Sequence, residues 1–488
     1  MSSIKRELVS GVFYTSLAKY SSYAVQLVVS AILARILTPE DYGIVAIAVV
    51  FIAFFNLLSD IGIGPAIIQF KDLSHSELSQ IFSFTGFLGL SVAFLFFLCS
   101  WPIAYYYENT NLVYVCQLLS LTILFYCLNI VPQNIQYREK NFKFTATVTL
   151  ASNMATAVLA ITFALLGFGV YALVFQQIFS IAIVFLIFYY KSKLSFVFKF
   201  NIAPLKKIFS YSIYQFLFNL INYFSRNLDK LLIGRYIGLS PLGHYEKSYN
   251  MMMLPLQNIT FAVTPVLQPV FSSMQNNLQE MAEKYKKVFT LLCFIGFPLS
   301  TLLFFIGKEL ILLFFGNQWY DAILPFRILA LTVGLQVLNG TSGSIYQSAN
   351  ATKQLFISGC WCGFFMVTSF AVTIIGWGTI KAVAIGYLVA QLFNSAQTYY
   401  LLFKTLHYPI KSILRVMIYP IMLSLIIGTC LFVSYQLLEN INMLLSLSLK
   451  VVIALLIWYV GVNFNGPYKG MVNVQIEKLW GRFARNGV

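Results

Sequence analysis

Charged side chains are scarce in this chain. Only 10% of its 488 residues are Asp, Glu, Lys or Arg, whereas soluble domains carry about 25%. Hydrophobic residues make up 59%, and the mean hydropathy is +0.78. Apolar runs recur from Gly11 to Val462, so they are not confined to one tail anchor. The composition therefore excludes a soluble globular domain and predicts a chain whose solvent is the bilayer.

Motifs that carry chemistry are also lacking. The three histidines stand near predicted loops, and nearly all of the seven cysteines fall within apolar segments, where thiols pack as small hydrophobes. No D-x-D, H-E-x-x-H or Walker sequence occurs. The predicted external loops, such as 38–42, 167–169 and 439–442, are too short for a catalytic domain. We therefore expect no disulfide, metal site or cofactor, and we place the function within the membrane-spanning bundle.

Windows of about 20 apolar residues predict an all-α polytopic membrane protein with about fourteen transmembrane helices. The predicted spans are residues 11–34, 43–68, 79–100, 112–133, 144–166, 169–190, 208–236, 248–271, 286–307, 323–346, 355–376, 379–402, 412–436 and 446–463.

Acidic residues number 16 against 32 basic ones, which gives a net charge of +16. Such an excess could indicate nucleic-acid binding, but the basic residues gather in alternate loops, as the positive-inside rule expects of cytoplasmic loops. The clusters lie within 138–143, 191–207, 284–287 and 404–415. We therefore predict that both termini are cytoplasmic, and we expect no nucleic-acid partner.

The two halves of the chain match weakly at an offset of about 200 residues. Arg35 and Gly43 flank the first external turn, and Arg235 and Gly243 flank its counterpart. Because both copies would begin on the cytoplasmic side after six helices, we predict parallel, pseudo-symmetric repeats. The predicted domains are an N-terminal lobe at 1–200, a C-terminal lobe at 201–405, and helices thirteen and fourteen with a basic tail at 406–488.

Polar residues follow one face of the first helix of each repeat, because they recur every three or four positions. We predict that these two stripes line a central cavity between the six-helix lobes. The neutral residues among them could equally hydrogen-bond to neighbouring helices. The first stripe contains Lys19, Ser22, Tyr23 and Gln26, and the second contains Asn219, Asn222, Arg226 and Lys230.

Charged residues within the spans need water, a counter-ion or a functional role, because each costs about 2.5–3.5 kcal/mol on insertion scales. The cations Lys19, Arg226, Lys230 and Arg327 outnumber the acids Asp60 and Asp229, so the predicted cavity favours an anion. Arg and Lys are the usual partners of phosphate, which points to a diphosphate headgroup bound by Lys19, Arg226 and Lys230. The two acids are candidates for ion coupling or for counter-ions, and Asp229 could instead pair with Arg226 or Lys230.

Three segments, at residues 225–235, 34–43 and 242–258, resemble one family. That family is the bacterial polysaccharide flippases of the Wzx type, which handle O-antigen and exopolysaccharide. The segment 225–235, SRNLDKLLIGR, resembles their N-x-D-K-hydrophobic-I-G stretch. The segment 34–43, ARILTPEDYG, resembles their R-x-L-x-P-x-D-Y-G turn. Residues 242–258 are similar to the start of their eighth helix, especially in the colanic-acid-exporter-like branch.

This resemblance implies the multidrug, oligosaccharidyl-lipid and polysaccharide exporter superfamily, in which two further helices follow the two six-helix lobes. It implies a transporter of the bacterial inner membrane and not an enzyme. Its cargo would be an undecaprenyl-diphosphate-linked oligosaccharide, passed from the cytoplasmic to the periplasmic leaflet by alternating access, with an ion gradient hypothesised as the energy source. Membrane lipids and assembly proteins such as a polysaccharide polymerase are the expected partners.

Two other functions remain as alternatives. A multidrug or cation exporter of the same fold would need an acidic or aromatic cavity for organic cations, and the predicted stripes are basic. A membrane-embedded polysaccharide polymerase or ligase would be expected to carry a catalytic motif or a large external loop, and neither occurs in the sequence.

Overall fold

The computed structural model describes residues 3–59, 63–70, 72–197, 223, 226–438 and 441–464. Within these ranges every regular element is a helix. Nine of the helices so described are long and apolar enough to cross a membrane, or ten if one bent pair counts as a span. The predicted all-α membrane fold is confirmed, whereas the number of spans, about fourteen from hydropathy, stays approximate.

Contacts along the chain divide it into two compact units, and each is described here by itself. The first comprises residues 1–246 with 315–318, and the second comprises 247–314 with 319–488. The lobe boundaries predicted at residues 200 and 405 stay predictions.

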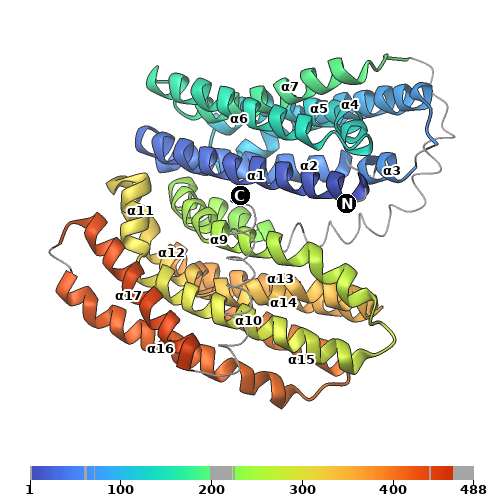
Figure 1. Ribbon diagram of the computed structural model, residues 1–488. Coiled ribbons are helices and arrows are strands. Elements are labelled where there is room, and N and C mark those ends of the chain that lie inside the picture. The colour runs from blue at the N-terminus through green and yellow to red at the C-terminus, as the bar shows by residue number, and fades with distance from the viewer. Residues whose placement is uncertain are drawn as a thin grey trace, which may run out of the picture. The chain divides into compact units, whose positions relative to one another are not determined.

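The first unit is a bundle in which α4 packs against α5, α5 against α7, and α1 against α6 (Figure 1). Its labelled helices are α1 (Ser3–Ile36), α2 (Pro39–Ser59), α3 (Ile63–Gln69), α4 (His75–Tyr107), α5 (Asn111–Arg138), α6 (Phe142–Leu165) and α7 (Val170–Ser192). The core where α3, α4, α5 and α7 meet contains Ile67, Phe82, Val131 and Phe185.

Side chains in the turns before α4 and α2 cap these two helices and fix where they begin. At the start of α4, Glu77 N–H donates to Ser74 Oγ at 3.2 Å, and Ser74 N–H donates back to the Glu77 carboxylate at 2.8 Å, which is a capping box. Thr38 and Asp41 make the same reciprocal pair at α2, at 3.2 and 2.9 Å. Pro39 is the first residue of α2. Proline suits this position because the first N–H groups of a helix have no intrahelical acceptor.

The predicted span 43–68 is divided in the structure. The long helix α2 ends at Ser59, and the short helix α3 begins at Ile63. Pro65 lies in the first turn of α3, where proline is tolerated because the first N–H groups of a helix have no intrahelical acceptor. A hydropathy window of about 20 residues does not register this division, because it spans both pieces.

The second unit holds most of α9 and the helices that follow. They are α9 (Leu239–Ser272), α10 (Leu278–Phe305), α11 (Gly307–Phe315), the 3-10 helix η1 (Asn317–Ala322), α12 (Ile323–Ala330), α13 (Val333–Ser348), α14 (Thr352–Trp377), α15 (Ile380–Thr405), α16 (Ile410–Leu438) and α17 (Met443–Phe464). The predicted span 323–346 is bent by 52° between α12 and α13. Thr332 at this bend donates its hydroxyl to Leu329 O at 2.6 Å.

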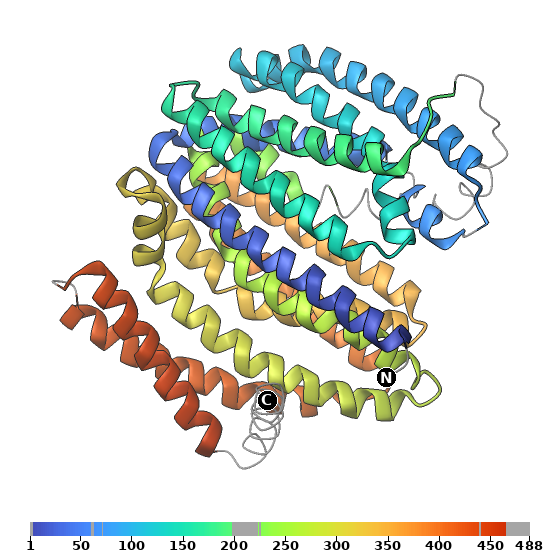
Figure 2. The same ribbon diagram turned by 45° about the horizontal axis from the view of Figure 1, so that its top comes forward.

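The last two helices, α16 and α17, lie side by side in both views (Figures 1 and 2), and both pack against α10. An ion pair between Lys450 of α17 and Glu309 of α11 is almost completely enclosed, with side chains 1% and 7% exposed. The hydroxyl of Ser446 donates to the same carboxylate at 3.1 Å. These contacts fix α17 to α11 within the second unit.

Candidate functional site

The predicted turn motif brings the two repeats into direct backbone contact. A Cβ atom on Gly43 would overlap the carbonyl oxygen of Leu239, and a Cβ atom on Gly243 would overlap that of Pro39. The contact is reciprocal, because each glycine lies on the helix start of the other repeat. Only glycine fits an approach this close. The two helix starts therefore pack as equivalents within the first unit, at the positions that the sequence comparison aligns.

The end of α1 is held from the second half of the chain. Gln318 donates from its side-chain nitrogen to Ala34 O and to Leu37 O, the latter at 3.1 Å, so a carbonyl in the last turn of α1 and the carbonyl just beyond the helix both find partners. Arg35 is exposed beside this contact. The Arg35 side chain of the motif is thus placed at the surface, whereas Gly43 is buried.

A helical hairpin carries Arg226, Asp229 and Lys230, three of the polar residues predicted in the second repeat. Residues 226–236 are helical, the chain turns at Gly238 with φ of 123°, and α9 begins at Leu239. Asp229 is 1% exposed. Its carboxylate accepts from Tyr245 Oη at 2.9 Å and from the backbone N–H of Lys230 at 2.8 Å. The buried acid is therefore hydrogen-bonded, and the predicted pairing with the side chain of Arg226 or Lys230 is replaced by these neutral donors.

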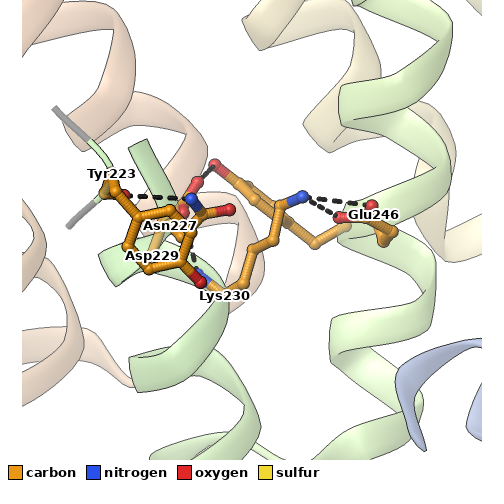
Figure 3. Close-up of polar contacts among 6 residues, drawn as sticks. Tyr223, Asn227, Asp229, Lys230 and Glu246 are labelled. Carbon is orange, nitrogen blue, oxygen red and sulfur yellow. Dashed lines mark hydrogen bonds and ion pairs between the residues drawn. The ribbon is translucent and has the colours of Figure 1, made fainter. Parts of the chain in front are cut away.

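Lys230 is paired with a carboxylate across the hairpin (Figure 3). Its Nζ lies 2.9 Å from Glu246 Oε2 and 3.1 Å from Oε1, and the two side chains are 13% and 17% exposed. A phosphate oxygen approaching Lys230 would have to compete with Glu246. Because both side chains keep some access to solvent, a phosphate oxygen can reach Lys230 and compete with Glu246.

Arg226 differs from Lys230 in that it is exposed and makes no ion pair with any acid in the described part of the chain. The next residue, Asn227, donates from its side chain to Tyr223 O at 2.9 Å (Figure 3). Tyr223 in turn donates its hydroxyl to Val50 O of α2. These bonds fix the start of the hairpin on α2. Arg226 is thus the predicted cation that the described structure leaves open to an anion.

The other predicted residues are only partly described. Ser22 and Tyr23 are half-buried on α1, and Gln26 is exposed. Lys19 lies in α1, but its side chain is outside the described part of the structure. Asn219, Asn222 and Asp60 also lie outside the described residues. The cavity lined by both stripes therefore stays a prediction.

Arg235 of the motif makes an ion pair that the sequence did not predict. Its Nη1 lies 2.7 Å from Glu108 Oε1, just beyond the end of α4, and its guanidinium lies 5.1 Å from the centre of the Tyr106 ring. Beside it Tyr107 donates its hydroxyl to Leu231 O at 3.2 Å. These contacts attach the end of the 226–236 helix to α4.

Sequence reasoning missed Tyr245 and Glu246, although a signal for them exists. Each partner stands 16 residues after the residue that it contacts, Tyr245 after Asp229 and Glu246 after Lys230. Both partners lie in the helix that follows the turn, close enough along the chain for a hairpin of two antiparallel helices to bring them into contact. A search for counter-ions in the helix after the turn would have found both.

This arrangement can bind an anion more readily than a metal. Its polar face combines an open guanidinium with a lysine whose carboxylate partner can be displaced, and both donor types suit phosphate oxygens. Among the side chains that the structure describes, no three His, Cys, Asp or Glu residues gather as metal ligands.

Comparisons with known proteins relate the chain to one family and to solved structures of similar fold. Residues 32–324 match a family model described as polysaccharide biosynthesis protein. The chain is 26% identical over 422 residues to the lipopolysaccharide biosynthesis protein WzxC of Escherichia coli (strain K12), covering 82% of each chain. Among solved structures it is similar to the lipid II flippase MurJ in an inward closed conformation, with a TM-score of 0.74, 17% identity, and 94% of this chain and 99% of that chain covered.

A second structural likeness is to an inward-facing multidrug resistance MATE family transporter of the MOP superfamily. The TM-score is 0.59 at 13% identity, over 79% of this chain and 95% of that one. The fold and the basic hairpin thus define a multi-pass membrane protein with the helical fold of this transporter superfamily. The chain belongs to the polysaccharide biosynthesis protein family, and the resemblance seen in the sequence is confirmed.

Proposed function

We propose that this protein is a flippase, which moves an undecaprenyl-diphosphate-linked oligosaccharide from the cytoplasmic to the periplasmic leaflet of the bacterial inner membrane by alternating access. The observation that carries the proposal is family membership over most of the chain, joined to a fold shared with a lipid II flippase. The proposed topology has both termini in the cytoplasm, which rests on the basic loops.

The diphosphate is the part of the cargo that the hairpin is suited to bind. Arg226 is exposed and unpaired within the described residues, so its guanidinium can take two phosphate oxygens at once. Lys230 contributes when the phosphate displaces Glu246. Lys19, which the repeat aligns with Asn219, is proposed to supply the matching charge from α1.

Exchange of partners at Lys230 offers a way to couple binding with movement. When phosphate takes Lys230, Glu246 on α9 loses its partner and α9 loses one tie to the 226–236 helix. A ligand can shift a conformational equilibrium only through such differential contacts. Asp229, and Asp60 in the first repeat, are proposed as the sites where an ion gradient acts.

A multidrug exporter is the second candidate because the MATE fold is similar. The family match favours a saccharide cargo, and the open cation at Arg226 favours an anion over an organic cation. Transport, with no catalytic step, is the proposed activity in either case.

The deciding experiment follows the lipid-linked saccharide. Deleting the gene should trap lipid-linked repeat units in the cytoplasmic leaflet, where they are inaccessible to an external sugar-oxidising reagent. Complementation with Arg226→Ala or Lys19→Ala should leave surface polysaccharide absent while membrane abundance stays normal. Lys191→Ala, an exposed cation at the end of α7, is the matched control and should restore export. Full export by both Arg226→Ala and Lys19→Ala would exclude the headgroup site.

A further inference from the structure

A cavity of about 560 Å³ opens at the end of α4, outside the hairpin site. It is formed by the last turns of α4, the turn that leads into α5, and Arg235 from the 226–236 helix. A volume of this size lies within the ~300–1,000 Å³ typical of small-molecule sites. Nothing in the proposed headgroup chemistry uses this cavity.

Three aromatic side chains form much of its wall. Trp101, Tyr105 and Tyr106 are 49%, 86% and 47% exposed, respectively. Trp101 and Tyr105 stand four residues apart on one helix face, so their rings are presented in the same direction. Such rings offer an apolar surface with a polar edge, which suits a ligand of mixed character.

The polar part of the wall is a fixed pair of charges. Glu108 and Arg235 are 2.7 Å apart, and the guanidinium is held over the Tyr106 ring. The Glu108 side chain is still 75% exposed, so its carboxylate keeps free acceptor positions. Asn109 adds an amide beside it. Donors and acceptors thus stand side by side with little net charge.

We propose that this cavity binds an uncharged pyranose unit of a saccharide. A pyranose ring has an apolar face of C–H groups, which can lie on Trp101 or Tyr105, and an edge of hydroxyls, which both donate and accept hydrogen bonds. An anionic lipid headgroup suits the site less well, because Glu108 both neutralises Arg235 and repels a phosphate.

The position of the cavity gives it a place in the transport cycle. In the predicted topology α4 runs outward from the cytoplasm, so its end at Tyr107 lies on the external side. The saccharide would meet this site on leaving the protein. The role of the cavity as an exit site rests on the proposed function. The binding of a pyranose in the cavity does not depend on that function.

Aromatic residues near a membrane surface also form interfacial belts without binding any ligand. The chain offers matched residues that test this alternative. Trp361 is 47% exposed on α14 and Tyr190 is 87% exposed on α7, values close to those of Trp101 and Tyr105, and neither lines this cavity.

The test is a saccharide titration of the purified full-length protein in nanodiscs, followed by saturation-transfer NMR with free glucose, galactose and N-acetylglucosamine. We expect saturable binding of at least one sugar, weakened about three- to tenfold by Trp101→Ala and by Tyr105→Ala. Trp361→Ala and Tyr190→Ala should leave the affinity unchanged. Equal affinity in all four variants, or no saturable binding to the unaltered protein, would overturn the proposal.

A change of specificity gives an independent readout. Glu108→Gln removes the carboxylate that neutralises Arg235, so the site should gain affinity for glucuronate relative to glucose by several-fold. An unchanged ratio contradicts the assignment. The outcomes separate the two proposals. Normal transbilayer movement of the lipid-linked saccharide after deletion of the gene rejects the flippase, while the sugar site can stand. Loss of that movement after deletion, together with unaltered sugar binding by Trp101→Ala, rejects the sugar site alone.

Discussion

Two of the lysine–glutamate pairs in the described part of the chain lie in very different settings. Lys450 and Glu309 in the second unit are 1% and 7% exposed, and a serine hydroxyl completes the partnership. Lys230 and Glu246 in the first unit are 13% and 17% exposed, with the exposed Arg226 on the same helix. The enclosed pair cannot exchange partners without leaving a charge in an apolar interior, whereas the accessible pair can. This difference suits the enclosed pair to a structural role and leaves the accessible pair available to the proposed headgroup site.

The largest effect is expected from breaking the enclosed pair. Lys450→Met leaves the Glu309 carboxylate buried without its cation, which should lower the free energy of unfolding by ~3–5 kcal/mol. Thermal denaturation in detergent measures the change. The double variant Lys450→Met with Glu309→Leu removes both charges and should recover most of the loss. A single variant as stable as the double would mean that the pair is not an anchor.

The stability of the first unit is expected to depend more on the backbone contact at Gly43 than on the Lys230–Glu246 ion pair. Gly43→Ala forces a methyl group against Leu239 O and should destabilise the protein by about 1–3 kcal/mol. Gly359→Ala on α14 is the matched control, since a Cβ atom there meets nothing within 4 Å and alanine favours a helix. Denaturation of the two variants side by side gives the comparison, and equal stability would contradict the reciprocal contact.

The accessible pair should show its effect in binding and hardly at all in stability. Glu246→Gln removes the negative charge beside Lys230, so affinity for inorganic pyrophosphate should rise several-fold by titration calorimetry. Glu280→Gln changes a surface pair with Lys284 and should have no such effect. If Glu246→Gln leaves pyrophosphate affinity as it was, Lys230 is not part of the headgroup site.

The smallest effect concerns the acid behind the pair. Tyr245→Phe removes one hydrogen bond to Asp229 and leaves the bond from the backbone N–H of Lys230. A loss of about 1 kcal/mol is expected, as for a typical hydrogen bond. Thermal denaturation measures this loss of stability. A loss as large as that of Lys450→Met would mean that the hydrogen bond to Asp229 is as important for stability as the Lys450–Glu309 ion pair.

Much of this fold could be predicted from the sequence, because the bilayer imposes apolar runs of a fixed length. Every predicted span except 208–236 falls on described helices. The Arg35 to Gly43 turn and its counterpart were also predicted, since glycine and arginine recur at matching positions. The division at Ser59 and the bend at Thr332 were not predicted, because a hydropathy window of about 20 residues averages over both breaks.

The partners of charged residues were harder to predict. Glu309 and Lys450 are 141 residues apart, and no periodicity links residues on helices that are separate in sequence. Glu246 was within reach, because a short turn joins it to Lys230. The two cases differ in whether a local rule of helix geometry connects the partners.

The reciprocal contact of Gly43 and Gly243 has a mechanical consequence. No side chain lies between the two backbones there, so a larger residue at either glycine would displace both helix starts together.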